Sequence, residues 1–594
     1  MFRETSSQIS FFQPEISYPD VLPKDDWCHI FREQVYPLID EQMFKHLYKD
    51  SKLGAPNKSI KTMISLLIFM MLETLNWREV ENMFQRRIDW MIATYTSFGE
   101  ANVDFTTLFK FYCKLEADDT AYKFFKHLVQ QFIELCNISV DQQRVDSFFM
   151  FGWLKILSRY GLFKETIRKF LQSLRKQKPG LYEQIKGELS QEYLEKEFDL
   201  TEKNKDKASR KIQDMINDIY RLKEAFSNHK QVKNYETFKI MCTVFEQQCV
   251  VSKGSNKDGN SSVAEKKDSS NQTSEKISKN KRKKLARKQQ RKTSSSKKNA
   301  NSEQSIELRE KPAGDKIISN PHNTDAEYTK KRNQKVVGHK GFLTETCDPE
   351  NEVQFITDGN LETSTFSDSK EIENIMERLE ENDMKPKVLN GDAGFVTGKT
   401  ILSSESKGID LKGPVSGRSQ DIEKFDESDK KSRTLDITEF SVEIDNESNE
   451  LTVINCPNGQ TPIDQKRSDK TGKLLVHFSP EICSACPFQE RCPVTKGKKV
   501  NTLTVSEEQY AGAKRHQEYM TNPAYRKSCA IRSGAESLVN EVANGHGCRK
   551  SRHRSEKRSR LRLFFGIISC NVKRFMRYWA SSAHNQVDLT PVSP

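Results

Sequence analysis

The longest apolar stretch of the chain lies in its first quarter. Over Lys58–Leu75, apolar residues occupy nearly every face of a helix, which predicts a central core helix. Its most apolar run is too short to span a bilayer, so we interpret it as a buried helix. Helical patterns follow over Trp77–Ala93 and Asp104–Leu115. We therefore expect an all-helical N-terminal domain over residues 1–136, either a DNA-binding module or a structural bundle.

Three different patterns fill the middle of the chain. Residues 137–151 include NISVDQQRVD, whose alternation predicts a short strand over Asn137–Asp146. Residues 152–250 carry periodic Phe, Leu, Ile and Tyr in polar surroundings, which predicts a helical insertion. Residues 251–312 contain KNKRKKLARKQQRKTSSSKK and few large apolar side chains, which predicts a basic disordered linker. This linker is a DNA-contacting segment, a solvated tether, or both.

The next region alternates between strand and helix patterns. Residues 313–435 contain two strand-like segments, QKVVGHKGFLTETC and NEVQFITDGNLET, followed by an amphipathic helix over Asp368–Asn382. A short buried strand at Lys387–Asn390 ends in GDAGF, and a further strand is expected within Gly408–Gly417. This order predicts a mixed α/β core.

The last part of the chain combines a second insertion with basic helices. Residues 436–505 are expected to form a β-hairpin, with its turn at Asn446–Ser448, and a cysteine-rich insertion. Residues 506–580 read as strongly basic helices, and residues 581–594 as a tail. The predicted fold class is therefore α/β: a mixed sheet with flanking helices, interrupted by a helical and disordered insertion and a β-plus-cysteine insertion, and preceded by an all-helical domain.

Charge and cysteine content narrow the classes of function. Among 594 residues, 96 Lys and Arg outnumber 83 Asp and Glu, giving a net charge of +13 that points to a polyanionic partner such as DNA. The N-terminal segment lacks the long apolar region of a secretory signal. The 13 cysteines show no regular disulfide framework. We expect a cytoplasmic protein with no membrane partner, and without a GxxxxGK loop an ATP requirement is not indicated.

Three carboxylates stand in surroundings that suggest metal chemistry. Asp146 and Asp392 are expected near strand termini, and Glu536 lies on a predicted helix with Arg532 one turn before it. Three converging carboxylates can hold two Mg²⁺ ions for cutting and joining phosphodiester bonds, and an arginine can grip a phosphate in bidentate fashion. The alternative is that the two aspartates are turn or cap residues and that Arg532 and Glu536 form a surface ion pair.

Four cysteines form a second group. Cys456 begins CPNGQ, and Cys483, Cys486 and Cys492 belong to CSACPFQERC. The C-x2-C spacing is that of a zinc knuckle, and four thiolates would close a tetrahedral structural Zn²⁺ site. The alternative is a set of unliganded buried cysteines.

A basic run near the C-terminus is the third group. It precedes an apolar helix over Leu561–Trp579. Such a helix could pack on one face and contact DNA phosphates on the other, or the run could be a solvated helix face. Its arginines are Arg549, Arg552, Arg554, Arg558, Arg560 and Arg562.

These segments together resemble bacterial insertion-sequence transposases of the DDE class, which have an RNase H-like catalytic domain. The resemblance rests on DFTTLFKF, VDS at Asp146, TDAEYTKK with VVGHKG, GDAGFVTG at Asp392, CPNGQ, CSACPFQERC and RSGAE. It implies a catalytic triad of Asp146, Asp392 and Glu536 with Mg²⁺ or Mn²⁺, and makes Arg532 the arginine of the tyrosine–arginine–glutamate–lysine signature. It also implies cleavage at the ends of an element and 3′-hydroxyl strand transfer on double-stranded DNA. Because both ends must be held together, we expect a homodimer or a larger assembly on the DNA.

The chain departs from that family pattern at His339, where many relatives carry an aromatic residue, and at two positions of the signature. Cys529 stands where the signature has tyrosine, and Ala543 stands where it has lysine. Glu541 is an alternative third carboxylate, although it lacks the arginine spacing. Two other functions therefore stay open: an inactive or repurposed transposase that only binds DNA, and a nuclease that cleaves DNA without joining it.

Overall fold

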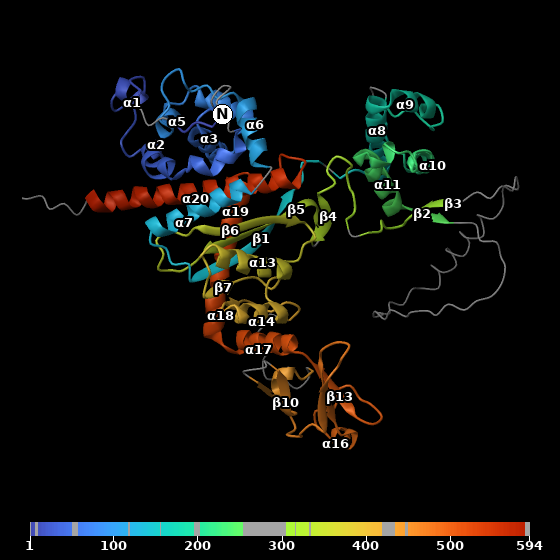
Figure 1. Cartoon of the computed structure of the whole chain (residues 1–594). Helices are drawn as coiled ribbons and strands as arrows, with labels where there is room; N and C mark the ends of the chain where they lie inside the picture. The colour runs from blue at the N-terminus through green and yellow to red at the C-terminus, as the bar shows by residue number, and fades with distance from the viewer. Residues whose placement is uncertain are drawn as a thin grey trace, which may run out of the picture. The chain divides into compact units, whose positions relative to one another are not determined.

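The computed structural model divides the chain into two compact units, Met1–Ile156 with Ile318–Pro594, and Leu157–Ile317 (Figure 1). It describes residues 2–5, 10–49, 57–116, 119–154, 156–194, 202, 204–252, 305–314, 316–331, 334–418, 434–445 and 450–587. Among these residues no single helix is long and apolar enough to cross a membrane. The helices at Ile60–Leu72 and Trp77–Phe84 meet that criterion only as a pair bent by 115°.

A mixed sheet forms the centre of the first unit, as the sequence predicts. Among the described residues it has six strands in the order β4-β5-β1-β7-β8, with β6 paired to β5. β1 runs antiparallel to β5 and parallel to β7. The bounds are β1 Gln142–Phe151, β4 Glu327–Lys331, β5 Gln334–Thr346, β6 Ile356–Thr363, β7 Val388–Asn390 and β8 Asp410–Lys412.

The predicted N-terminal helices are present. The core helix is α3, which Ser59 caps, and Asp104 caps α6. Asn76 and Glu79 form a capping box at the start of α4. The bounds are α1 Pro14–Ser17, α2 Trp27–Ile30, η1 Phe31–Val35, η2 Tyr36–Leu38, η3 Glu41–Leu47, α3 Ile60–Leu72, α4 Trp77–Phe84, α5 Ile88–Ala93, α6 Phe105–Leu115 and α7 Thr120–Leu135.

The long C-terminal helix α20 (Glu556–Val587) joins these helices to the sheet in one hydrophobic core. It packs against α3, α7 and β6 (Figure 1). Phe575 stacks on Phe132 of α7 with ring centroids 4.1 Å apart. On the sheet side, the Asn571 side chain exchanges two hydrogen bonds of 2.9 Å with the backbone of Ile356. The helix therefore links the N-terminal helices to the strand layer.

Two helices flank the later strands, and a β-rich insertion follows. The helices are α13 Asp368–Glu381 and α14 Gly398–Ser406. The predicted hairpin is present as β9 and β10, and its turn residues 446–449 lie outside the described residues. A small core of its own holds the insertion together. Its elements are η6 Ile437–Glu439, β9 Ser441–Ile444, β10 Leu451–Asn455, β11 Asp464–Arg467, β12 Leu474–Phe478, α16 Pro480–Ser484 and β13 Asn501–Val505.

Short helices return the chain from the insertion to the sheet. They were predicted as a helical C-terminal region, and they precede α20. Their bounds are α17 Glu507–Thr521, α18 Pro523–Cys529, η7 Ala530–Gly534, α19 Ala535–Asn540 and η8 Glu541–Gly545.

The second unit is helical, as predicted for residues 152–250, but the expected linker begins too early and ends too late. Ser305–Leu308 forms β3, which pairs antiparallel with β2 at Cys249–Ser252. The alternation of SIEL supports a strand that the basic composition around it concealed. Residues 253–304 lie outside the described residues. The helices are α8 Arg159–Gln177, α9 Pro179–Lys186, α10 Lys205–Phe226, η4 Val232–Asn234 and α11 Glu236–Gln248.

Two buried histidines and one partly buried histidine make the first unit sensitive to acid. Burial lowers the pKa of His339, His546 and His553 from 6.5 to about 4 in each case. Because the unfolded chain binds protons more tightly, stability is lost as pH falls from about 6.5 towards 4. We expect a loss of about 2 kcal/mol per histidine between pH 7 and pH 5.

Urea unfolding followed by tryptophan fluorescence measures this loss, because all five tryptophans lie in the first unit. The variant His546→Gln should show a pH dependence smaller by about one third. An unchanged dependence in that variant would contradict the assignment.

Candidate active site

The parallel pairing of β1 with β7 brings Asp146 and Asp392 together. In this register Arg144 lies beside Asn390. Parallel strands advance residue by residue, so Asp146 and Asp392, each two residues further on, are expected to lie level with each other. The loop after β7 holds its carboxylate in place, since Gly394 N donates to Asp392 Oδ1 at 2.8 Å.

The prediction that Asp146 lies near a strand terminus is wrong. The expected strand was Asn137–Asp146, whereas β1 runs over Gln142–Phe151 and Asp146 lies in its middle. The strand continues past Asp146 because Phe148 and Met150 are buried in the core, and because pairing with β5 continues to Phe151. Asp392, in contrast, follows the last residue of β7 as predicted.

Glu536 comes to the sheet on the C-terminal helices. It lies on α19, directly after η7, and both elements pack against β1. Arg144 of β1 donates from Nη1 to the Ile531 carbonyl at 3.0 Å, which ties η7 to the strand. A Cβ atom at Gly534 would collide with the Arg144 guanidinium. The glycine of RSGAE therefore permits the close approach that places Glu536.

One cavity of about 370 Å³ brings the predicted residues together. We call it the carboxylate cavity. Asp146, Asp392 and Glu536 all line it, and so does Arg532. The full lining is Val145, Asp146, Asp392, Tyr519, Arg526, Cys529, Ala530, Arg532, Ser533 and Glu536. Carboxylates from the sheet and α19 thus share one cavity with guanidinium groups.

Sequence reasoning missed two polar residues of this cavity, Tyr519 on α17 and Arg526 on α18. Arg526 Nη1 donates to the backbone carbonyls of Tyr519 at 3.0 Å and Met520 at 2.6 Å. α17 is held against α14, where a side chain at Gly398 would collide with the backbone of α17. Neither residue is spaced from Glu536 in a way that predicts contact. The basic and aromatic composition of α17 and α18 was the signal in the sequence that could have indicated them.

Glu541, the alternative third carboxylate, is engaged elsewhere. It forms ion pairs with Lys573 at 3.2 Å and with Arg574 at 2.9 Å. Burial acts to raise the pKa of Glu541, but the charges and hydrogen bonds of Arg574 and Lys573 outweigh it and hold the pKa at about 2. Its ligand atoms also lie within 4.8 Å of those of His546 and Cys570. Glu541 does not line the carboxylate cavity.

Two stretches of the chain match known protein families. Residues 455–576 match a family described as transposase DDE domain, and residues 17–114 match one described as transposase domain (DUF772). Both matches support an insertion-sequence DDE transposase. No curated protein and no solved structure gives a significant match to it. The mixed sheet of this transposase is compatible with the RNase H-like fold that a DDE domain implies.

Only some of the predicted site residues lie within the stretch that matches the DDE domain family. The DDE match includes Arg532 and Glu536 and begins after Asp392. The two departures from the family signature are both buried: Cys529 is 2% exposed and Ala543 is 0% exposed. Cys529 lines the carboxylate cavity but offers no phenol, and Ala543 offers no ammonium group. The cavity lining does contain a tyrosine, Tyr519, but it lies on α17 and not at the signature position.

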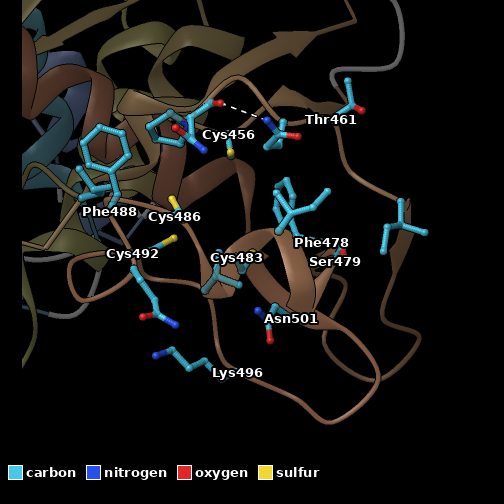
Figure 2. A pocket seen from close by; sticks show the side chains of 18 residues that line it. Cys456, Thr461, Phe478, Ser479, Cys483, Cys486, Phe488, Cys492, Lys496 and Asn501 are labelled. Carbon is cyan, nitrogen blue, oxygen red and sulfur yellow. Dashed lines mark hydrogen bonds between the residues drawn. The ribbon is translucent and has the colours of Figure 1, made fainter.

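The four predicted cysteine ligands converge in the β-rich insertion of the transposase. Cys456, Cys483, Cys486 and Cys492, here called the cysteine cluster, line one cavity of about 70 Å³. Figure 2 shows the sulfur atoms of Cys456, Cys486 and Cys492 directed towards the same gap. The cluster lies within the residues that match the DDE domain family.

The basic run does not form one exposed row of arginines. Arg562 is 4% exposed and donates to the Gly547 carbonyl. Arg558 forms an ion pair with Glu116 at 2.6 Å. The backbone carbonyls of Thr74 and Leu75 accept from Arg552, that of Leu361 accepts from Arg560, and the Asn544 side chain accepts from Arg549. α20 is central to the core, so its arginines satisfy neighbouring groups, while Arg554 is exposed.

Proposed function

We propose that this transposase cleaves DNA at the ends of its element and joins the freed 3′-hydroxyl to target DNA, with Asp146, Asp392 and Glu536 as its catalytic carboxylates. The observation that carries the proposal is that all three, together with Arg532, line one cavity. They approach from a central strand, the loop after its parallel neighbour and a late helix. Carboxylates that are far apart in the sequence converge in this way where they share a ligand.

The donor set fits hard divalent cations. Carboxylate oxygens are the ligands that Mg²⁺ and Mn²⁺ prefer, and the carboxylate cavity offers three such side chains. When bound, such ions activate the attacking oxygen and stabilise the departing one. Arg532 and Arg526 line the same cavity and are suited to bind the scissile phosphate through paired N–H donors.

The joining step needs no external energy source. At the element end, water attacks the phosphate, and the broken phosphodiester bond leaves a 3′-hydroxyl and a 5′-phosphate. In the joining step this 3′-hydroxyl attacks a target phosphate, so one phosphodiester bond forms while one target bond breaks and releases a 3′-hydroxyl on the target strand. Catalysis then consists of positioning the strands and neutralising charge. Two ends must be held at once, so we propose double-stranded DNA as the partner and a homodimer as the working assembly. Arg554 and the residues of the basic linker are the candidate phosphate contacts outside the cavity.

Excision from a plasmid that carries the DNA flanking this gene tests the proposed function. The intact protein should excise the element and generate joined target products. A nuclease would yield cut ends without joined products. Retained DNA binding with no cleavage in Mg²⁺ or Mn²⁺ would overturn the proposal in favour of a repurposed DNA-binding protein, the alternative that Cys529 and Ala543 motivate.

Arg526 gives a prediction that the family signature does not make. We expect Arg526→Met to lower strand cleavage by about 100-fold, because it removes a cationic donor from the cavity where charge develops on the phosphate. Arg526→Lys should recover part of the rate, since it restores the charge without the planar fork. Single-turnover cleavage of labelled end DNA measures both.

The adjacent Lys527 provides the matched control. It is exposed and does not line the cavity. Lys527→Met should cleave DNA at nearly the rate of the intact protein. Equal losses in the Arg526 and Lys527 variants would show that Arg526 acts only through general charge.

A further inference from the structure

The four cysteines of the cluster lie in turns and loops around one cavity. After β10, Cys456 begins a tight turn in which Gly459 N donates to the Cys456 carbonyl at 2.8 Å. Gly459 has a φ of +73°, which glycine adopts without strain. A second turn joins Cys483 to Cys486, whose N–H donates to the Cys483 carbonyl at 3.3 Å. A C-x2-C turn such as Cys483–Cys486 is a common frame for two ligands of a tetrahedral metal site.

The burial of these cysteines differs from that of most others in the chain. Seven of the nine remaining cysteines are buried, as expected for small apolar side chains. All four members of the cluster are only partly buried, and none is in a disulfide. Four thiols that line one cavity without forming a disulfide are an arrangement that a metal ion can bind.

The side chains of the cluster suit a cation that accepts sulfur ligands, because four thiols line one small cavity. The carboxylate cavity offers hard oxygen ligands, whereas this cavity offers soft sulfur ligands, so the two sites favour different metals.

The insertion has reason to need such a cross-link. Its core is small, and Ile463 and Ile482, which line the same cavity, are 60% and 48% exposed. A metal ion would join three segments of the insertion: the end of β10, α16 with the turn after it, and the loop before β13. β13 leads directly into α17, which carries Tyr519.

We propose that Cys456, Cys483, Cys486 and Cys492 bind one structural Zn²⁺ through four thiolates, and that this ion holds the β-rich insertion in shape. The site is independent of the carboxylate cavity and of catalysis. Zinc binding therefore succeeds or fails as a proposal whether or not the protein cleaves DNA.

Metal analysis of the purified full chain tests the site. We expect about one Zn²⁺ per chain in the intact protein, with Zn–S distances of about 2.3 Å by X-ray absorption. Cys486→Ser and Cys492→Ser should lose most of the metal. Cys113→Ser, which changes another half-exposed cysteine outside the cluster, should keep it.

Two further measurements separate this site from alternatives. Cys570→Ser changes the group formed by Glu541, His546 and Cys570, and it should keep its zinc. The Co²⁺-substituted intact chain should give the absorption bands of tetrahedral thiolate coordination, a readout that does not depend on any variant folding. A metal-free intact chain, or zinc lost from Cys570→Ser and kept by Cys486→Ser, would overturn the proposal.

Discussion

Glu536→Gln is expected to reduce strand cleavage by about 1,000-fold or more while leaving DNA binding and stability nearly unchanged. The side chain is exposed at the cavity on α19, so its amide replacement disturbs no buried contact. It does remove one anionic oxygen ligand from a site whose chemistry depends on bound cations. Cleavage of labelled end DNA in Mg²⁺ and in Mn²⁺, with thermal unfolding of the same preparations, measures both properties.

Glu541→Gln is the matched control, five residues further along the chain. Glu541 is paired with Lys573 and Arg574, so its loss should lower the free energy of unfolding by about 2 kcal/mol. Below the unfolding transition, cleavage should continue. The reverse pattern, in which Glu541→Gln abolishes cleavage in a stable protein and Glu536→Gln does not, would move the third carboxylate to Glu541.

Arg574→Met is expected to destabilise the first unit by about 3–5 kcal/mol, the range for breaking a buried ion pair. Arg574 lies 2.7 Å from Glu345, whose side chain is 1% exposed, and it also pairs with Glu541. Removing it leaves a buried carboxylate with reduced compensation. Arg144 pairs with the same Glu345 at 2.6 Å and also holds η7. Removing Arg574 should therefore also disturb Arg144 and lower the rate of strand cleavage.

Lys573→Met is the control for Arg574→Met, because it also removes one positive charge but leaves the pair of Arg574 with Glu345 intact. Lys573 is 33% exposed and contacts only the Glu541 end of the network at 3.2 Å. A partly exposed ion pair of this kind is expected to contribute about 1 kcal/mol or less. Urea unfolding followed by tryptophan fluorescence measures the free energy of unfolding of the first unit in both variants. Similar losses in the two variants would contradict the role given to Arg574.

The sequence predicted the parts of the site that are local in the chain. Asp392 follows a short apolar strand, and the pattern of GDAGF was enough to place it at a strand end. Arg532 and Glu536 are one helical turn apart, a spacing that reaches one cavity. Asp146 was found with the wrong strand bounds, because apolar residues on both sides of it leave the start of a strand undefined.

What the sequence did not predict depends on contacts between distant segments. Tyr519 and Arg526 reach the cavity only because α17 docks on α14 after a long insertion. The sequence favoured phosphate contact for the basic run, yet Arg552 and Arg558 bond to the N-terminal part of the chain and Arg560 bonds to β6, which composition cannot reveal. β3 was concealed by the basic segment before it.

Counting bound Mn²⁺ ions tests the central claim most directly. In a complex of the intact protein with the DNA flanking its gene, electron paramagnetic resonance of free Mn²⁺ should show about two ions bound per catalytic domain. Asp392→Asn and Glu536→Gln should each bind fewer ions on the same DNA. Unchanged Mn²⁺ binding in both variants would contradict the assignment of these carboxylates as metal ligands.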